Sequence, residues 1–281
     1  MRELLARVRR GGVSVDEAAR ALAQAPAHAV GEFAQLDGER ALRMGVPEVI
    51  FGEGKTPAQI EQLVARLAAL GQGVLVTRLA PEGAEAALRA LPRGTHDPVS
   101  RTFLAPPPGK ARKPQGLVCV VAAGTTDIPV AEEAAITASF VGAGVARVFD
   151  VGISGIHRLL GRVTELREAD ALVVCAGMEG ALPSVVGGLV ARPVFAVPTS
   201  VGYGASQRGM AALHAMLNSC AANVSVVNID NGFGAGFSAA LVARHAKPLK
   251  RPNGPAAPLG SVRPSKGVAP RQGVVPPKGK R

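Results

Sequence analysis

The chain has 281 residues, 47% of them hydrophobic and 19% charged, which is enough to form the core of one large domain or two smaller ones. Aromatic residues make up only 3% of it, with one Tyr and no Trp, which argues against nucleic-acid binding through stacked bases. No apolar run reaches the roughly 18 residues that a membrane span needs. Cys119, Cys175 and Cys220 lie far apart without a CxxC spacing, which argues against a disulfide scaffold or a zinc finger and favours a reduced, cytoplasmic setting.

The positive charge is concentrated at one end of the chain. The formal net charge is +11, but residues 247–281 contain nine Lys or Arg and no Asp or Glu, so the remainder carries only +2. The same 35 residues contain eight prolines and five glycines, and we predict that they are disordered. Such a tail could contact nucleic acid or an anionic surface, but a solubilising extension is the simpler interpretation. We therefore expect no specific nucleic-acid partner.

Residues 1–112 indicate a small α+β domain that ends in a linker. Ser14 and Glu17 have the spacing of a capping box before a helical run, and Thr56-Pro57 is typical of a helix start. The predicted strands are 48–52 and 74–79, the predicted helices that follow them are 58–70 and 82–91, and the Pro-rich linker is 105–116.

Residues 113–246 alternate short apolar strands with helices. We predict strands at 116–124, 146–151, 171–177, 192–197 and 224–229, and helices near 129–142, 155–168, 181–190, 206–221 and 236–246. Strands that are apolar throughout are typical of a parallel sheet covered on both faces. The alternation predicts an α/β fold with a doubly wound parallel sheet of about five strands, whose ligands bind beyond the carboxyl ends of the strands.

The segment after each of these strands is rich in glycine and small hydroxyl residues. The five segments are AAGTTDIP (122–129), DVGISGIHR (150–158), CAGMEGALPS (175–184), VPTSVGYGAS (197–206) and NIDNGFGAG (228–236). Glycine lets the backbone approach a ligand, and the N–H groups at helix starts favour phosphate. Five such segments on one edge of a sheet indicate a phosphate-bearing ligand, although no GxxxxGK[ST] loop is present and the first turn lacks GxGxxG.

Two of these segments resemble the PurE-type aminoimidazole ribonucleotide carboxylases and mutases. The turn at Gly124, Thr125, Thr126 and Asp127 is similar to that family's Gly-Ser-x-Ser-Asp turn, and residues 176–198 resemble its Ala-Gly-x-x-x-His-Leu-Pro-Gly stretch and the strand after it. The position of the family's catalytic His is Ala181. The ordinary purine reaction could not proceed here by the same proton transfer.

A closer resemblance, spanning roughly residues 40–246, is to the LarB family of nickel-pincer nucleotide cofactor synthesis. It is carried by long strings at 45–57, 122–134, 150–158, 175–189, 198–206 and 218–236. The resemblance implies a pyridinium-3,5-biscarboxylic acid mononucleotide synthase. Such an enzyme carboxylates nicotinic acid adenine dinucleotide at C5 with CO₂ or bicarbonate, and hydrolyses the phosphoanhydride to release AMP. It also implies a homo-oligomer, for which an octamer is one candidate, and Mg²⁺ is the default cation for the phosphates.

LarB-like enzymes are thought to add a cysteine to the pyridinium ring, and the resemblance places Cys220 in this role. The alternative for Cys220 is a small buried helix residue. Cys175, at the end of a strand, is a second candidate with a supporting role, although a buried strand residue is the stronger interpretation. Cys119 in mid-strand is expected in the core. Glu179 could remove the C5 proton or bind a metal, or could simply lie favourably at a helix start.

The remaining candidates would bind the substrate. Asp127 could cap a helix, contact a ribose or, with Glu179, hold a metal, and Arg158 could pair with a phosphate or with the ring carboxylate. His157 is expected on a helix surface, and Glu53 and Lys55 could complete the site. The predicted binding residues are Gly124, Thr125, Thr126, Asp127, Asp150, Gly152, Arg158, Gly177, Met178, Ser200, Gly202, Tyr203, Gly204, Asn231 and Gly232.

Two other functions remain open from the sequence. One is a PurE-like carboxylase or mutase of a purine ribonucleotide, against which Ala181 and the additional N-terminal domain both argue. The other is a non-catalytic nucleotide-binding protein, which would keep the glycine-rich segments but would not require Cys220.

Overall fold

A computed structural model describes residues 2–23, 27–38, 40–109 and 113–246 of the chain. The predicted disorder of 247–281 concerns residues outside these ranges. Among the described residues, no helix is long and apolar enough to cross a membrane.

The small domain is built on a four-stranded sheet with the order β3-β4-β6-β5. Its strands are β3 (Ile50–Phe51), β4 (Val74–Thr77), β5 (Thr95–Asp97) and β6 (Thr102–Ala105), and the predicted helices are present as α4 (Pro57–Ala69) and α5 (Pro81–Ala90). β3 and β4 are parallel, whereas β6 runs antiparallel to both of its neighbours. The short strands β5 and β6 were not predicted from the sequence.

Five further elements precede this sheet. They are α1 (Arg2–Arg9), α2 (Val15–Ala23), the antiparallel hairpin of β1 (Ala27–Val30) and β2 (Ala34–Asp37), and α3 (Arg40–Met44). The predicted capping box before α2 is present, because Glu17 N–H donates to Ser14 Oγ and Ser14 N–H donates to the Glu17 carboxylate. The capping box at Thr56 also forms, which explains why α4 begins where the sequence predicts.

The large domain contains the predicted five-stranded parallel sheet, with the order β11-β10-β9-β7-β8. Its strands are β7 (Leu117–Ala122), β8 (Gly144–Val148), β9 (Ala171–Ala176), β10 (Val194–Pro198) and β11 (Val224–Val226). The chain moves from β7 to β8 on one side and then returns to β9 on the other side. The direction of winding therefore changes between β7 and β9, which is where doubly wound sheets bind ligands.

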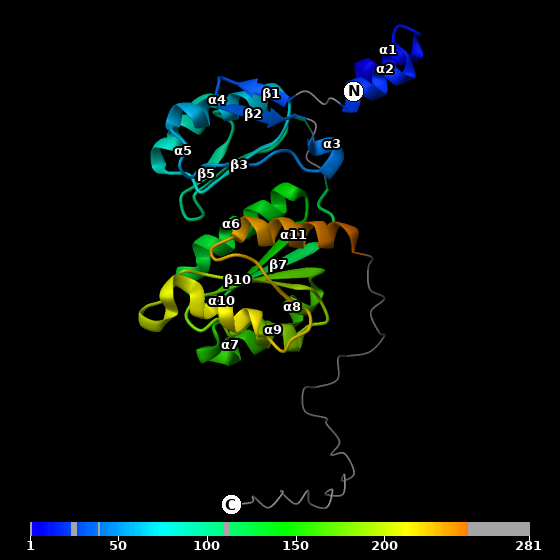
Figure 1. Cartoon of the computed structure of the whole chain (residues 1–281). Coiled ribbons are helices and arrows are strands. Elements are labelled where there is room, and N and C mark those ends of the chain that lie inside the picture. Colours follow the sequence, from blue (N-terminus) through cyan, green and yellow to red (C-terminus); the bar gives the residue numbers. More distant parts are fainter. Residues whose placement is uncertain (1, 24–26, 39, 110–112, 247–281) are drawn as a thin grey trace, which may run out of the picture. The chain divides into compact units, whose positions relative to one another are not determined.

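Two helices cover one face of this sheet and four shorter ones lie on its other side (Figure 1). The first pair is α6 (Ile128–Val141) and α11 (Gly232–His245), and the second group is α7 (Ile156–Leu160), α8 (Val163–Glu168), α9 (Leu182–Leu189) and α10 (Met210–Leu217). The helix predicted at 155–168 is interrupted between α7 and α8. The helix predicted at 206–221 is replaced by a 3₁₀ segment, η3 (Gly204–Gly209), followed by α10.

α6 and α11 touch through their backbones. A Cβ atom built on Gly236 would lie 2.2 Å from the carbonyl oxygen of Ala134, and one built on Gly232 would lie 2.2 Å from that of Val130. These glycines allow a close approach that no other residue would permit. The contact fixes the start of α11 against α6, and both helix starts lie at the carboxyl edge of the sheet.

Candidate functional site

The predicted binding residues lie on the segments that follow the strands of the large sheet. Gly124, Thr125, Thr126 and Asp127 follow β7; Asp150, Gly152 and Arg158 follow β8; Gly177, Met178 and Glu179 follow β9; Ser200, Gly202, Tyr203 and Gly204 follow β10; and Asn231 and Gly232 follow β11. Because all five strands are parallel, these segments share one edge of the sheet. The structure therefore brings the predicted binding residues to one edge of the sheet.

Backbone hydrogen bonds connect neighbouring segments at this edge. Met178 N–H donates to Val201 O (2.9 Å), and Asp230 N–H donates to Pro198 O (2.9 Å). The segments after β9 and β10 approach each other closely, since a Cβ atom on Gly177 would lie only 2.4 Å from Val201 O. The glycine at 177 is therefore required by the packing between segments, whatever else it contacts.

Asp127 is buried and connects two of these segments through hydrogen bonds. Its Oδ2 accepts from Gly124 N–H (2.9 Å), and its Oδ1 accepts from the hydroxyl of Thr199 (2.6 Å). Burial raises the pKa of this carboxyl, although the Thr199 hydroxyl and the backbone N–H groups of Gly124 and Gly177 oppose the shift. Of the sequence-based alternatives, this arrangement favours the structural one, in which Asp127 organises the turn before α6.

Arg158 and Asp150 pair with each other across the segment after β8. The guanidinium Nη1 of Arg158 contacts Asp150 Oδ2, and both side chains are more than one third exposed. An exposed pair of this kind contributes little to stability. Arg158 therefore remains available to an anionic ligand, which would have to compete with Asp150.

Asn231 caps α11, and its Oδ1 accepts from Gly234 N–H (2.8 Å). Its neighbour Asp230 has a carboxylate that accepts from Ser200 N–H (2.8 Å), so it connects the segments after β10 and β11. Tyr203 projects into solvent with 80% of its surface exposed. It is the one tyrosine of the chain, and its exposed ring is accessible for stacking on an aromatic ring of a ligand.

A cavity of about 320 Å³ opens at this edge and is lined by both domains. The large domain contributes the start of α6 and residues after β10 and β11, and the small domain contributes the ends of β3 and β4 and the β5–β6 turn. The lining residues are Glu53, Arg78, Val99, Ser100, Arg101, Thr126, Pro129, Val130, Glu133, Ser200, Val201 and Asp230. Glu53, expected to complete the site, is among them, whereas Lys55 instead donates to Phe51 O (2.7 Å).

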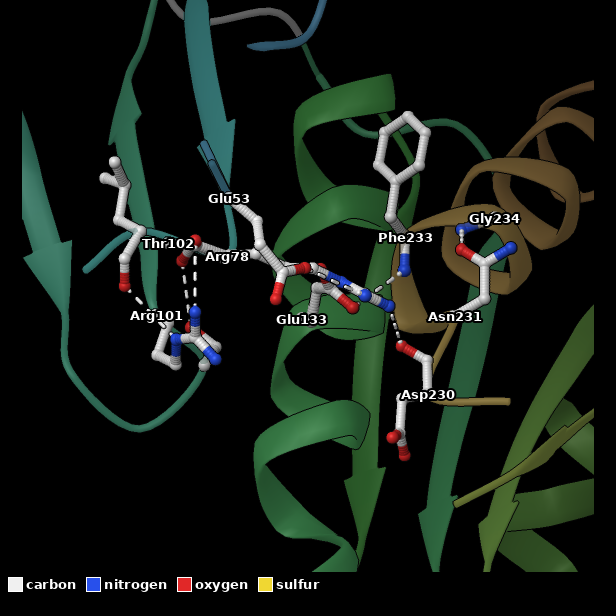
Figure 2. A network of polar contacts seen from close by, with 11 residues as sticks. Glu53, Arg78, Arg101, Thr102, Glu133, Asp230, Asn231, Phe233 and Gly234 are labelled. Carbon is white, nitrogen blue, oxygen red and sulfur yellow. Dashed lines mark hydrogen bonds and ion pairs between the residues drawn. The ribbon is translucent and has the colours of Figure 1, made fainter. Parts of the chain in front are cut away.

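Arg78 lies at the centre of the polar network in this cavity (Figure 2). Its Nη2 donates to the backbone oxygen of Asp230 (2.6 Å), its Nη1 to Glu53 Oε2 (3.4 Å), and its Nε lies 3.8 Å from Glu133 Oε1. Arg101 lies beside it and donates to the backbone oxygens of Leu79 (3.1 Å) and Arg78 (3.2 Å). Both arginines come from the small domain.

Glu133 is a carboxylate on α6 with only 4% of its surface exposed. Its Oε2 accepts from Phe233 N–H (3.2 Å) at the start of α11, whereas its Oε1 has no hydrogen-bond partner among the described residues. Burial raises its pKa, and the charge of Arg78 is the main opposing influence. An ionised carboxylate in this position is balanced by the arginine and by the start of a helix.

Arg78, Arg101 and Glu133 are not among the residues predicted from the sequence. Arg78 is the first residue after β4. Residues directly after a strand were the candidates in the large sheet, and the same rule would have pointed to Arg78. Nothing in the sequence showed that the small domain faces the carboxyl edge of the large sheet. Glu133 lies inside the string at 122–134 but looks like an ordinary polar helix residue.

The three cysteines lie in different surroundings. Cys119 and Cys175 have no exposed surface, and burial raises the pKa of the Cys119 thiol to about 12 and that of Cys175 well above its ordinary value. The expectation for Cys119 as a core residue is thus met. The supporting catalytic role expected for Cys175 finds no support, because its thiol is buried in the core between the sheet and the α6–α11 layer and resists ionisation.

Cys220 is exposed, so it is not the buried helix residue that was its alternative interpretation. It lies after α10 and beside α9, since Ser219 Oγ accepts from the Ser184 hydroxyl (2.8 Å) and Ala221 packs against Gly187. It does not line the cavity. Glu179 is also exposed and precedes α9 in the segment after β9, whereas Cys220 lies between α10 and the start of β11.

Several residues without the freedom of glycine adopt a left-handed backbone around this edge. Asp150, Met178 and Asp230 follow strands of the large sheet with φ between +52° and +58°, and Arg78 and Arg101 have φ of +53° and +56°. Such conformations cost about 1–3 kcal/mol each and concentrate at functional sites. The strain marks the same edge that the sequence and the cavity indicate.

The residues here do not fit a metal held by the protein. Mg²⁺ takes oxygen ligands, and the two oxygens of Asp127 already accept hydrogen bonds from Gly124 and Thr199. Within the described ranges, no three or more His, Cys, Asp or Glu are grouped so that they could hold a metal ion. The expected pair of Asp127 and Glu179 is thus not supported as a metal site.

Two family models match this chain. Residues 28–106 match the family model of the LarB/PurE-like N-terminal domain, and residues 117–252 match that of AIR carboxylase. A protein of Methanocaldococcus jannaschii named as uncharacterized is 38% identical over 251 residues, which cover 87% of this chain and 97% of that protein. The N5-carboxyaminoimidazole ribonucleotide mutase of the same organism is 28% identical over 141 residues, covering 49% of this chain and 82% of the mutase.

Proposed function

Because the chain belongs to the LarB family, with a LarB/PurE-like N-terminal domain and an AIR carboxylase domain, we propose that it carboxylates nicotinic acid adenine dinucleotide. The two domains support a carboxylase-type function. In the proposed reaction C5 of the pyridinium ring gains a carboxylate and the phosphoanhydride is hydrolysed. The products are pyridinium-3,5-biscarboxylic acid mononucleotide and AMP, as in the first step of nickel-pincer nucleotide cofactor synthesis.

The observation that carries this proposal is the composite edge of the large sheet. Five segments rich in glycine and hydroxyl residues meet there, and a cavity with two arginines from the small domain adjoins them. Backbone N–H groups and arginines together are suited to a ligand with phosphates. A dinucleotide supplies such phosphates together with two ring systems.

In the proposed carboxylation Cys220 acts as the nucleophile. Its thiolate adds to C4 of the pyridinium, forming a C–S bond and a dihydropyridine whose C5 has enamine character. C5 attacks CO₂, the C5 proton leaves to a base, and expulsion of the thiolate restores the aromatic ring. Covalent catalysis of this kind divides one difficult step into several easier ones.

Glu179 is the proposed base for the C5 proton. It lies in the segment after β9, where Met178 is hydrogen-bonded to Val201 of the cavity lining. Glu179 and Cys220 are both exposed, and the proposal directs the nicotinate half of the substrate to them. No step is assigned to a metal held by the protein, and any Mg²⁺ would arrive with the phosphates.

The mutase-like alternative has the similarity to N5-carboxyaminoimidazole ribonucleotide mutase in its favour. Against it stands Ala181, which caps α9 where the PurE-type pattern has its catalytic His. A methyl group cannot transfer a proton, so the purine reaction would need another acid at this place. The small domain also has no counterpart in the AIR carboxylase match, which starts at residue 117.

We propose that the active form is a homo-oligomer. Several large apolar side chains are exposed on the α7–α10 side of the large domain, among them Ile156, Leu160, Met210 and Leu217. In the proposed oligomer, side chains of this kind would be covered by another copy of the chain. Light scattering of the purified protein would give the number of subunits.

A product assay with a matched pair of variants tests the function. The protein, its Cys220→Ser variant and its Ala222→Ser variant are each incubated with nicotinic acid adenine dinucleotide, bicarbonate and Mg²⁺, and the products are identified by mass spectrometry. Ala222 is exposed and lies two residues from Cys220, so it controls for a general effect of a new hydroxyl.

We expect a mononucleotide with one additional carboxylate, together with AMP, from the wild type and Ala222→Ser. Cys220→Ser should lose at least a hundredfold in rate. Product formation by Cys220→Ser at the wild-type rate would exclude the covalent mechanism, and the absence of product from all three proteins would contradict the proposed carboxylation.

A further inference from the structure

The cavity between the two domains contains charges that the carboxylation mechanism does not use. It has two arginines on its small-domain side and the start of α6 on the other side, with carboxylates at its margins. Its volume of about 320 Å³ is at the lower end of the range for small-molecule sites, which is suitable for one nucleotide but small for a whole dinucleotide. These groups would therefore recognise one part of a dinucleotide rather than the whole of it.

The arginines are arranged to receive an anion. Among the described residues Arg101 donates only to backbone oxygens and forms no ion pair within 4 Å, so part of its guanidinium is uncommitted. Arg78 has a single direct contact with each of its neighbours and no two-point pairing with a carboxylate. Facing them, Thr126 and Pro129 lie at the start of α6, a helix of 14 residues whose N-terminus favours phosphate.

The carboxylates are arranged to receive hydroxyl groups. Glu133 Oε1 is buried and has no hydrogen-bond donor, although its residue lines the cavity. Glu53 and Asp230 add further acceptor oxygens at the margin. Carboxylates next to a phosphate site are the common means of binding ribose hydroxyls. Cations for a phosphate together with acceptors for hydroxyls match a ribose phosphate.

We propose that this cavity binds the adenosine phosphate half of a dinucleotide substrate, with Arg78 and Arg101 contacting its phosphate and the cavity carboxylates accepting from its ribose. The inference rests on the proposed function, to which it adds the place of the second nucleotide. The nicotinate half would then lie toward Glu179 and Cys220, across the segments after β9 and β10. The cleaved phosphoanhydride would lie between the two halves.

The comparisons give an independent reason for assigning this role to the small domain. The mutase relative is named for a ribonucleotide, a substrate with one nucleotide, and its similarity covers only 49% of this chain. The AIR carboxylase match leaves out the small domain, and it is the small domain that contributes Arg78 and Arg101. A domain beyond the mononucleotide-binding part is accounted for if it binds a second nucleotide.

Glu133 is a positioning residue in this scheme. It is held at the start of α11 by Phe233 N–H, and its other oxygen lies 3.8 Å from Arg78 Nε. The carboxylate thereby attracts the guanidinium toward α6, where the phosphate would bind. Replacing it with a neutral amide should release Arg78 without removing it.

Binding measurements on the full chain test the proposal. Isothermal titration calorimetry with ADP-ribose, which contains the second half, and with nicotinic acid mononucleotide, which contains the first half, would be performed on the wild type, Arg101→Gln and Arg78→Gln. Arg89→Gln is the matched control, because Arg89 lies on α5 of the same domain with its side chain 58% exposed and paired only with Glu61 at 3.5 Å.

We expect Arg101→Gln and Arg78→Gln to weaken ADP-ribose binding at least tenfold and to leave nicotinic acid mononucleotide binding within twofold. Arg89→Gln should change neither. ADP-ribose binding that is absent from the wild type, or unchanged in both variants, would overturn the proposal. Equal weakening of both probes would also overturn it, because the arginines would then not distinguish the two halves.

Glu133→Gln adds a readout that a purely structural role would not produce. We expect a higher KM for the dinucleotide with a smaller change in kcat, weaker ADP-ribose binding and unchanged binding of nicotinic acid mononucleotide. Equal loss for both probes would contradict the positioning role. If ADP-ribose binds through Arg101 but no carboxylated product forms, the proposed carboxylation fails while the nucleotide assignment of the cavity stands.

Discussion

The two faces of the large sheet are packed by different means. The α6–α11 face is built from small residues, and its helices contribute Ala131, Ala134, Ala135, Ala138, Ala235, Ala239, Ala240 and Ala243 to the core. The opposite face is packed by larger side chains, including Leu159, Leu166, Leu172, Leu182 and Met216. The small-residue face brings two helix backbones into direct contact, whereas the large-residue face fills the space between its helices and the sheet with larger side chains.

This difference explains why the buried acidic groups lie at the α6–α11 face of the sheet. The close contact of α6 and α11 brings the starts of both helices together at the carboxyl edge, and Asp127 and Glu133 are the two buried acids of the described residues. The opposite face has short, interrupted helices and carries Cys220 on its surface. The α6–α11 face thus holds two buried carboxyl groups in place, whereas the opposite face carries an exposed thiol.

The largest expected effect concerns the thiols, because each face buries one of them. Cys119 belongs to the large-residue face and Cys175 to the small-residue face, both without exposed surface. At any pH below about 9, Cys119 with its pKa of about 12 contains roughly a thousandfold less thiolate than a thiol at the ordinary 9.0. We expect only Cys220 to react rapidly with Ellman's reagent in the native protein, and all three thiols to react in guanidinium chloride.

Rapid reaction of a second native thiol would show that the face containing it opens readily. Mass mapping of the modified peptide would identify which face that is. The Cys220→Ser variant is the control, and almost none of its thiols should react with Ellman's reagent before unfolding.

The next largest effect is expected at the helix contact. Gly236→Ala would place a methyl group 2.2 Å from Ala134 O, where the backbone cannot easily move aside, so we expect a loss of about 2–3 kcal/mol in the free energy of unfolding. Gly188→Ala, in α9 on the opposite side, has no atom within 4 Å of its new Cβ and should stabilise by about 0.5 kcal/mol. Urea denaturation measures both variants, and equal effects would remove the distinction between the two faces.

A smaller effect is expected at Asp127. Asp127→Ala would leave the Gly124 N–H and the Thr199 hydroxyl without their partner, at a cost of about 1–2 kcal/mol at neutral pH. Asp127→Asn keeps an acceptor and should cost less. Urea denaturation at neutral pH compares the two variants, and an equal loss in both would show that the lost hydrogen bonds are not the cause.

The pH dependence distinguishes charge from shape at this position. The folded-state pKa of Asp127 is raised from its ordinary 3.8, so the folded protein holds this proton more tightly than the unfolded chain does. The stability of the wild type relative to Asp127→Asn should therefore fall as the pH rises from about 3.8 through the folded pKa. A relative stability that increased over this range would show that favourable contacts of the carboxylate outweigh its burial.

The smallest effect is expected from the basic C-terminal segment, which lies outside the described residues. Deletion of residues 253–281, which lie beyond the AIR carboxylase match, should change product formation by less than twofold. Loss of most of the activity would mean that this segment takes part in the reaction.

The general architecture could be predicted from sequence because its signals are local. Apolar strands with helices between them predicted the parallel sheet, and the glycine-rich segments after the strands do share one edge of it. The short strands β5 and β6 were missed because three or four residues carry too little periodicity. The break between α7 and α8 at Gly161 and Arg162 also lacked a strong local signal.

The polar network of the cavity could not be predicted, because it depends on contacts far apart in the chain. Arg78 meets the backbone of Asp230 across 152 positions, and Glu133 meets Phe233 across 100. The burial of Cys175, by contrast, agrees with the stronger of the two interpretations that its place in a strand allowed, that of a buried strand residue.

The left-handed residues around the edge have a consequence for attempts to improve the thermal tolerance of this protein. Glycine adopts a left-handed backbone with less strain than other residues do. Glycine at some of these positions would therefore raise the melting temperature; the positions are Arg78, Arg101, Asp150, Met178 and Asp230. Each such gain would also delete a charged or polarisable group from the place where a nucleotide is proposed to bind. Stability selections and activity selections should therefore favour opposite residues at these same positions.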